Sequence, residues 1–406
     1  PAHIPDRSGR PPFRIGRWTS RVRGLPEVFG DLPVASLADE IETPGDGQVR
    51  AVITVAGNPV LSTPNGARLD RAFAALDSMV SVDPYLNATT RHADVILPPP
   101  GALQRSHYDA AFYGLSVRNV ANYTPAVTAK DPDTPDEWEI LLRLGAIAAG
   151  QGADADVAAF DHLVAATVAH RVTSSAGSPV HGRDAEELLA AVGHRRGPDR
   201  LVDLLLRSGP YGDHFNGGGD GLSLDLLLDH PHGIDLGPLE PRVPGNLTTA
   251  SGAIELAPEP ILADLERVRT TLAQEPAELV LVGRRHLRTN NSWMHNVPML
   301  NKGRDLCCLQ IHPEDASHFG LVDGADAEVS SIAGSIVVPV EVTEDIAPGV
   351  VSIPHGFGHD LDGVRLRVAV ERPGRNSNLL TPETDLDALS GTAVLNGIPV
   401  TVRPAP

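Results

Sequence analysis

The last third of the chain constrains the fold most, because short apolar segments alternate there with turns. From about residue 276 the sequence contains ELVLVG, LCCLQI, ADAEVSSI, GSIVVPVEV, GVVSIP, VRLRVAV and IPVTV. Their β-branched residues and short length are typical of strands, and turn pairs such as Asp323-Gly324 separate them. Many short strands joined by tight turns indicate a closed β-barrel. One short helix is expected at PEDASHFG, with Pro313 at its first position and Gly320 after its end.

Residues 50–150 show a different pattern. AVITV is a continuous β-branched run of the kind found in parallel strands that are covered on both faces. NGARLDRAFAALDS has apolar residues at helical spacing, and the expected strands MVSVD and HADVILPPP follow it. This order of elements predicts a small doubly wound unit, whose ligands usually lie at the C-terminal ends of the strands. The predicted fold class is therefore α/β plus β.

The remaining parts of the chain are less regular. Residues 1–49 are rich in Pro and Gly, contain one expected helix around ASLADEIET, and have neither an initiator Met nor a signal peptide. We therefore expect the chain to be a fragment or a processed piece. Residues 151–275 begin with helical patterns such as DAEELLAAV and DRLVDLLLRSG. A Gly/Pro-rich hinge with an expected hairpin at GNLTTASGAIELAP follows them.

Composition argues against several classes of protein. Asp and Glu number 52 against 33 Lys and Arg, and the resulting net charge of −19 argues against general nucleic-acid binding. Cys307 and Cys308 are adjacent, so they suit neither a disulfide framework nor a spaced metal site, and we expect them to be buried thiols of a strand. No apolar run is long enough to form a transmembrane segment.

Polar residues follow three of the expected strands, at positions where a loop can present hydrogen-bond donors to a ligand. Gly57-Asn58-Pro59 follows AVITV, and Asp83 follows MVSV. The stretch GRRHLRTNNSWMHN, residues 283–296, follows ELVLV. Each of these also has a structural interpretation: an Asn-Pro turn, a turn or helix cap, and a solvated loop.

Three further segments contain residues with candidate roles. His355 and His359 in HGFGH could bind zinc, but the sequence offers no third ligand at a suitable spacing. We therefore favour a loop, hinged by its glycines, that lies over a ligand. Asp136 begins an expected helix, where an acidic residue interacts favourably with the helix dipole. Asn376 and Asn378 in GRNSNLLT carry amide groups that both donate and accept hydrogen bonds.

Seven segments in a fixed order carry a resemblance to a known family. They are VAGNPVLSTPNGARL, SVDPYLNATTRHADVILPPP, DEWEIL, LVGRRHLRTNNSWMHN, HPEDASHFGLVDGADAEVSS, APGVVSIPHGFGH and NSNLLT followed by Asp and SG. Along nearly its whole length the chain resembles the C-terminal half of the molybdopterin oxidoreductases that bind two molybdopterin guanine dinucleotides. This group includes formate dehydrogenase, nitrate reductase and dimethyl sulfoxide reductase.

The resemblance implies a domain organisation. Residues 50–150 would form a Rossmann-like α/β domain, and residues 276–406 a double-psi β-barrel, the molybdopterin dinucleotide-binding domain. Residues 1–49 would be an irregular connection to a missing portion of a second domain. Residues 151–275 would be a helical and hinge segment.

The resemblance also implies site residues. Asn58, between Gly57 and Pro59, would contact one dinucleotide. Asp83 would accept hydrogen bonds from guanine N1–H and N2–H₂, and Asp136, two residues before a Trp, would contact a nucleotide. The other implied contacts, to pterin and pyrophosphate groups, are Gly283, Arg284, Thr289, Asn290, Ser292, Trp293, His295, Asn376 and Asn378.

The implied cofactors are two molybdopterin guanine dinucleotides with molybdenum or tungsten, used for two-electron chemistry such as formate oxidation or oxyanion reduction. In the family the metal-ligating residue and the iron–sulfur cysteines lie in the first half of the protein. We therefore expect a missing N-terminal half as a partner, no catalytic or metal-ligating residue in this chain, and no turnover by this chain alone. An electron-transfer subunit, a small-molecule substrate and a cytoplasmic location are also expected.

One alternative is a non-catalytic scaffold that has the same fold but binds no molybdenum cofactor. The large electron-transfer subunit of respiratory complex I resembles this family but has no molybdenum cofactor. A scaffold of that kind is expected to have lost the polar loops 283–295 and 376–378, which persist here. A barrel reused to bind protein partners is a third possibility, against which the segments of the α/β domain argue.

Overall fold

The computed structural model describes residues 15–216 and 221–406, and this part of the chain divides into two compact units. Unit 1 consists of Pro99–Leu256. Unit 2 consists of residues 15–98 and Ala257–Pro406. The predicted boundaries at 49, 150 and 275 remain a prediction.

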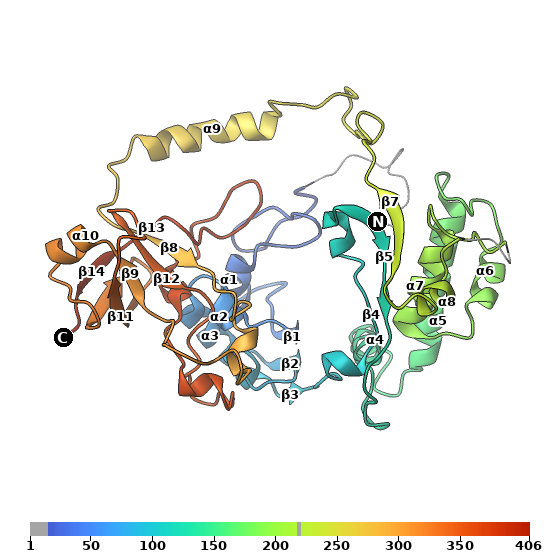
Figure 1. The fold of residues 1–406 in the computed structure, drawn as a ribbon, viewed down its shortest axis with the longest axis horizontal. Helices are drawn as coiled ribbons and strands as arrows, with labels where there is room; N and C mark the ends of the chain where they lie inside the picture. The colour runs from blue at the N-terminus through green and yellow to red at the C-terminus, as the bar shows by residue number, and fades with distance from the viewer. Residues whose placement is uncertain (1–14, 217–220) are drawn as a thin grey trace. The chain divides into compact units, whose positions relative to one another are not determined.

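Unit 2 begins with a small parallel sheet packed against helices (Figure 1). The strand order is β1-β2-β3, with β1 (Ala51–Val55), β2 (Ser78–Val82) and β3 (Val95–Ile96) all parallel. Its helices are α1 (Leu37–Glu42), α2 (Pro59–Ser62) and α3 (Gly66–Ala74), with 3-10 turns η1 (Val34–Ser36) and η2 (Thr90–His92). Leu69 and Phe73 on the apolar face of α3 pack with Met79 of β2, because helical spacing places both on one side. Each of the three predicted strands and the helix after the first are present.

The rest of unit 2 is built on a seven-stranded mixed sheet with the order β13-β8-β12-β9-β11-β10-β14. The strands are β8 (Val280–Arg284), β9 (Leu309–Ile311), β10 (Asp326–Ser330), β11 (Ser335–Val342), β12 (Val350–Pro354), β13 (Ile398–Pro399) and β14 (Thr401–Pro404). Only Val400 separates the two edge strands β13 and β14, so the sheet must curl until its edges approach each other (Figure 1). Leu281, Leu309 and Ile353 fill its interior.

One longer helix, a short helix and three 3-10 turns also belong to this part of unit 2. They are α9 (Glu259–Leu272), α10 (Pro313–His318), η5 (Trp293–Asn296), η6 (Ala369–Glu371) and η7 (Ser377–Leu380). Strand β9 begins one residue after the adjacent cysteines, of which Cys307 is buried and Cys308 half-buried. Burial raises the pKa of each of these thiols to about 11, which keeps them protonated and neutral at neutral pH.

The predicted strand VRLRVAV is wrong, because a side chain takes the place of a partner strand. Asn296 Oδ1 accepts hydrogen bonds from the backbone nitrogens of Val368 (2.9 Å) and Ala369 (3.3 Å), and the segment ends in η6. Asn301 Nδ2 donates to the Val368 carbonyl at 3.1 Å. The two asparagines bond backbone groups of Val368 and Ala369, and the Arg365 backbone nitrogen donates to the Leu86 carbonyl at 2.9 Å, so these groups are satisfied outside the sheet.

Unit 1 is mostly helical. Its helices are α4 (Glu137–Ala148), α5 (Val157–Ser174), α6 (Ala185–Ala191), α7 (Gly197–Ser208) and α8 (Leu224–Leu228), with η3 (Ala102–Gln104) and η4 (Phe112–Leu115). Two strand pairs accompany them, β4 (His107–Tyr108) with β6 (Tyr123–Thr124) and β5 (Arg118–Ala121) with β7 (Ile234–Pro238). The expected hairpin at 245–258 is wrong. Thr249 Oγ1 instead donates to the Ala253 carbonyl at 2.7 Å in a local turn. No helix in the described residues is long and apolar enough to cross a membrane.

Candidate functional site

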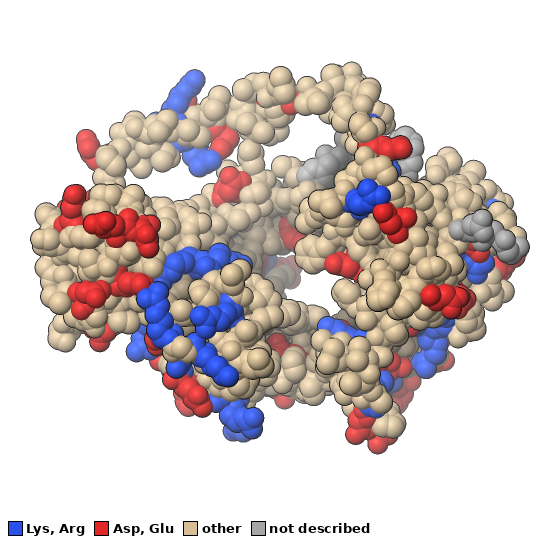
Figure 2. All heavy atoms as spheres, in the orientation of Figure 1, with Lys and Arg blue, Asp and Glu red and all other residues tan. Residues whose placement is uncertain are grey.

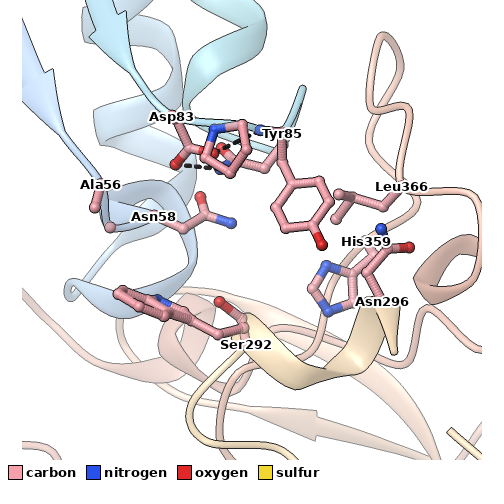
Figure 3. A pocket seen from close by; sticks show the side chains of 12 residues that line it. Ala56, Asn58, Asp83, Tyr85, Ser292, Asn296, His359 and Leu366 are labelled. Atoms are coloured by element: carbon pink, nitrogen blue, oxygen red, sulfur yellow. Dashed lines mark hydrogen bonds between the residues drawn. The ribbon is translucent and has the colours of Figure 1, made fainter. Parts of the chain in front are cut away.

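The first half of the site lies where β1 ends. Gly57 has a φ of +76° with open space around its Cα, a conformation that favours glycine. Asn58 is buried at the start of α2, and its Oδ1 accepts a hydrogen bond from Thr89 Oγ1 at 2.7 Å. Thr89 Oγ1 in turn accepts from the Val60 backbone nitrogen at 3.1 Å. These bonds hold the Asn58 side chain by its oxygen and leave its amide nitrogen to face the cavity (Figure 3).

Asp83 occupies the equivalent place at the end of β2. Its Oδ1 accepts from the Tyr85 backbone nitrogen at 2.7 Å, and its Oδ2 accepts from Asn87 Nδ2 at a longer 3.4 Å. Burial raises the pKa of the Asp83 carboxyl, and the two hydrogen bonds oppose this only in part. A carboxylate offers about four acceptor positions, so Asp83 can still accept hydrogen bonds from a ligand.

The second half of the site comes from the loop after β8. Asn290 and Asn291 have left-handed φ values of +39° and +59°, which turn the chain sharply before η5. Ser292 and Trp293 follow the turn, and the Trp293 side chain is 58% exposed although it is large and apolar. An exposed aromatic ring beside a cavity is suited to stack on a planar ligand.

Two cavities share Gly57, Asn58, Ser292 and Trp293. The smaller one has a volume of about 150 Å³, and Asp83, Tyr85, Asn87, Asn296, His359 and Leu366 also line it. In Figure 3, Asn58 and Asp83 approach it from one side and Ser292, Asn296 and His359 from the other. The larger one has a volume of about 620 Å³, and its further lining includes Gly283, Arg285, His355, Asn378 and Asn396. The structure therefore brings seven predicted site residues together: Gly57, Asn58, Asp83, Gly283, Ser292, Trp293 and Asn378.

Within the described residues, several other predicted site residues do not line these two cavities. Arg284 turns inward and donates to the carbonyls of Ser352 (2.9 Å) and Cys308 (3.1 Å), where it ties neighbouring strands together. The Thr289 hydroxyl donates to the His286 carbonyl at 3.0 Å, and Asn290 serves the turn. Pro59 begins α2. The roles of these residues toward a cofactor remain predictions.

Asp136 lies in unit 1, at the start of α4. Its backbone nitrogen donates to Glu139 Oε2 at 2.9 Å, and its Oδ1 pairs with Lys130 Nζ at 2.8 Å. These contacts account for an acidic residue at a helix start. Its predicted contact with a nucleotide stays a prediction.

Asn376 and Asn378 connect the C-terminal part of unit 2 to α2. Asn376 Nδ2 donates to the Val60 carbonyl at 3.1 Å, and Asn378 Nδ2 donates to the Leu61 carbonyl at 2.7 Å. The two residues are also joined, because Asn376 Oδ1 accepts from the Asn378 backbone nitrogen at 2.9 Å. Their amide groups satisfy carbonyls of α2, so they fix the loop at residues 57–59 relative to the curled sheet.

We expect Asn378→Ala to lower the free energy of unfolding by about 1–3 kcal/mol, because it leaves the buried Leu61 carbonyl without its donor. Urea unfolding curves of the two proteins measure the difference. The exposed Asn246, whose side chain makes no hydrogen bond within the described residues, provides the matched Ala control. Equal losses in the two variants would show that the contact with α2 contributes nothing.

Four histidines gather behind the loop that carries Trp293. His295 Nδ1 lies 2.6 Å from His359 Nε2, and the rings meet at an interplanar angle of 89°. Burial lowers the pKa of His295 to about 3 and that of His359 to about 4, and the nearby His355 and His286 add to the effect on His295. Burial also lowers the pKa of His355. No group of three His, Cys, Asp or Glu side chains in the described residues could hold a metal ion.

The sequence interpretation overlooked several lining residues. Tyr85 and Asn87 lie in the quoted segment SVDPYLNATT, and Asn87 Oδ1 accepts from the backbone nitrogens of Thr89 (2.9 Å) and Thr90 (3.0 Å). The pattern Asn-x-Thr-Thr signals such a turn and could have marked Asn87. Asn296 ends the polar stretch 283–296 and His359 belongs to HGFGH, but nothing in the sequence shows that their side chains meet at one cavity.

Comparison with known proteins identifies a domain in the C-terminal part of unit 2. Residues 279–399, which contain the Trp293 loop and every strand of the curled sheet except β14, match the "Molydopterin dinucleotide binding domain". The chain is 23% identical over 354 residues to the assimilatory nitrate reductase catalytic subunit of Bacillus subtilis, covering 84% of this chain and 42% of that protein. It is 23% identical over 366 residues to the biotin sulfoxide reductase of Cereibacter sphaeroides, covering 85% and 45%.

A solved structure is similar as well. The acetylene hydratase from Pelobacter acetylenicus superimposes with a TM-score of 0.62 over 92% of this chain and 47% of that one, at 16% identity, which shows a shared fold. The chain thus spans less than half the length of the curated relatives just named and of this structure.

Proposed function

We propose, from the premise that this chain belongs to the molybdopterin oxidoreductase family, that the cavities of unit 2 hold molybdopterin guanine dinucleotide. One observation carries the proposal. A buried, incompletely bonded carboxylate and a buried amide stand at the ends of adjacent parallel strands, and they face the exposed Trp293 of the matching domain. This is the position in which open α/β sheets bind their ligands.

The residues fit the two ends of such a cofactor. Asp83 would accept from guanine N1–H and N2–H₂, a two-point contact that suits a fixed carboxylate. Gly57 leaves room for a ligand to approach the backbone, and Ser292 and Asn378 offer neutral polar groups along the larger cavity. When bound, the molybdopterin supplies the thiolate ligands of molybdenum or tungsten and thus the two-electron redox chemistry. The chain's own residues would bind and orient it.

The finer assignments belong to the same proposal. The cavity of about 620 Å³ beside that of about 150 Å³ provides two neighbouring spaces, which is compatible with two dinucleotides. A Rossmann-like β1–β3 unit and a double-psi barrel are the folds we propose for the two sheets. Formate or an oxyanion is the proposed substrate class. A further N-terminal half would bring the metal ligand and an iron–sulfur cluster, an electron-transfer subunit would be the partner, and this chain alone would not turn over.

Asp83→Asn tests the proposal, because an amide replaces one of the two acceptors that guanine needs with a donor. We expect the affinity for the guanine end to fall by about 10-fold or more. The measurement is guanine nucleotide released by acid, per molecule of the longer protein that contains this chain, purified from cells that make the cofactor. Asp77→Asn is the matched control, since Asp77 precedes the same strand and forms only an exposed pair with Arg50.

The outcomes separate the candidate functions. Nucleotide and molybdenum in the wild type and the control, with less nucleotide in Asp83→Asn, is the expected result. Equal nucleotide in both variants would remove Asp83 from the site. A wild-type protein without nucleotide or metal would favour the cofactor-free scaffold of the complex I type.

A further inference from the structure

Two buried histidines meet directly, without a carboxylate or water between them. His295 and His359 are 6% and 1% exposed, and 2.6 Å separates Nδ1 of the first from Nε2 of the second. His295 also packs against Phe357, with ring centroids 4.3 Å apart. The two residues are 64 positions apart in the sequence, so the contact is a product of the tertiary fold.

In each ring, the nitrogen that takes no part in the contact between His295 and His359 can form a further hydrogen bond. Neither His295 Nε2 nor His359 Nδ1 has a hydrogen-bond partner within the described residues, although both atoms are buried. The Gly356 backbone can accept a hydrogen bond from a protonated His359, which opposes the effect of burial on the pKa of His359, although Nδ1 has no hydrogen-bond partner of normal geometry within the described residues. Buried polar atoms of this kind are uncommon in native proteins and call for an explanation.

The two rings lie beside different cavities. His359 lines the cavity of about 150 Å³ that contains Asp83 and Asn58 (Figure 3). His295 lines a separate cavity of about 20 Å³, which is enough for one water molecule. The charged side chains that line the second cavity are Arg288, Lys302, Arg304, Asp305 and Arg372. Figure 2 shows Lys and Arg gathered on one part of the visible surface, in contrast to the acidic chain as a whole.

The surroundings keep both rings neutral. After burial, the charges of His359, His355 and His286 lower the pKa of His295, and Arg288, Lys302, Arg304, Asp305 and Arg372 line the cavity beside it. A neutral pair contains one N–H in the shared hydrogen bond, so it has two arrangements. Either His295 donates from Nδ1 and His359 carries its single ring proton on Nδ1, or His359 donates from Nε2 and His295 carries its single ring proton on Nε2.

We propose that His295 and His359 form a proton relay between the small basic-rimmed cavity and the cavity lined by Asp83 and Asn58. One passage releases the proton on His359 Nδ1, moves the shared proton from His295 Nδ1 to His359 Nε2, and takes up a proton on His295 Nε2. One proton enters, one leaves, and no electrons move. The opposite passage restores the first arrangement, which serves a redox site that releases a proton in one half-reaction and takes one up in the other.

The relay rests on the proposed function for its purpose, but its physical basis is tested without cofactor. The 406-residue chain is labelled with ¹⁵N-histidine and examined by NMR. We expect His295 and His359 to be neutral at pH 7, to show scalar coupling between Nδ1 and Nε2 across the hydrogen bond, and to give nitrogen shifts averaged over both tautomers. A single fixed tautomer at each ring, or the lack of coupling, would overturn the relay whatever the cofactor content.

A second arm uses the longer, cofactor-loaded protein. His359→Gln keeps a polar side chain but cannot pass a proton through the ring, so turnover is expected to fall by about 10-fold or more with a larger solvent isotope effect, while guanine nucleotide and molybdenum contents stay at wild-type levels. His318→Gln, at an exposed site paired with Glu278, is the control. Unchanged turnover, or loss of bound nucleotide in His359→Gln, would contradict the relay. A wild-type protein without nucleotide would contradict the proposed function instead.

Discussion

Gly356→Ala is expected to abolish nucleotide retention and to lower the free energy of unfolding by about 2–5 kcal/mol, through backbone strain and overpacking together. Gly356 has a φ of +95°, which an L-residue with a side chain rarely adopts. A Cβ at this position would lie 2.3 Å from the Asn291 carbonyl oxygen and 2.6 Å from its carbon. Both contacts are with backbone, so no side-chain rotation relieves them.

The effect should reach the cofactor cavities because of what Gly356 touches. Asn291 and Ser292 line the larger cavity, and Ser292 precedes Trp293. A shift of this backbone would displace the Trp293 ring relative to Asn58 and Asp83, which line the same cavity. Urea unfolding measures the stability change, and acid-released guanine nucleotide from the longer protein measures retention.

Gly320→Ala is the matched control. Gly320 also has a positive φ, +68°, but nothing lies within 4 Å of its added Cβ. It should therefore cost only about 1 kcal/mol of backbone strain and leave nucleotide content unchanged. If the two variants behave alike, the close approach of Gly356 to Asn291 has no role in shaping the site.

Asp203→Ala is expected to destabilise unit 1 by about 3 kcal/mol, because it leaves a buried N–H and a largely buried cation without their acceptor. Asp203 is 1% exposed. Its Oδ1 accepts from the Leu224 backbone nitrogen at 2.9 Å, and its Oδ2 accepts from Arg195 Nε at 3.1 Å. The carboxylate thereby joins α7 to the start of α8. Arg195 keeps its exposed partner Asp225, so part of its pairing survives.

Hydrogen exchange measured by peptide separates the two units. Peptides of α7 and α8 should lose protection in Asp203→Ala, while peptides of β8 and β12 in unit 2 should keep theirs. The control is Asp154→Ala, at an exposed loop position without side-chain hydrogen bonds in the described residues. Uniform loss of protection across both units would show that they do not unfold separately.

Element types followed from local pattern, and the exceptions have physical causes. AVITV and MVSV became parallel strands, as predicted, but the first is not covered on both faces, because Ile53 and Val55 on one face are each 49% exposed. VRLRVAV had an equally good strand pattern, yet Asn296, more than 70 residues away in sequence, accepts hydrogen bonds from two of its backbone nitrogens. Strand propensity describes how a segment fits a sheet, and it cannot foresee a side chain that takes the partner's place.

The predicted site residues also fall into two groups, those that line the cavities and those that bond to other parts of the fold. Gly57, Asn58 and Asp83 were predictable, because residues at the ends of parallel strands meet at one edge of the sheet. Arg284 has the right chemistry for a phosphate, but it turns toward Ser352 and Cys308. Asn376 and Asn378 have the right chemistry for a pterin, and their amide nitrogens bind α2 carbonyls more than 300 residues away.

By itself, the sequence determined the kinds of most elements, the strand ends that carry polar residues, and the likeness to molybdopterin oxidoreductases. These depend on local spacing, residue type and motif order, all of which can be read directly from the sequence. Only the tertiary structure decided which polar groups face the cavities, which ones hold the fold together, and that His295 meets His359. Those outcomes depend on hydrogen bonds between distant segments, and a buried polar group takes whichever partner the packed fold brings within reach.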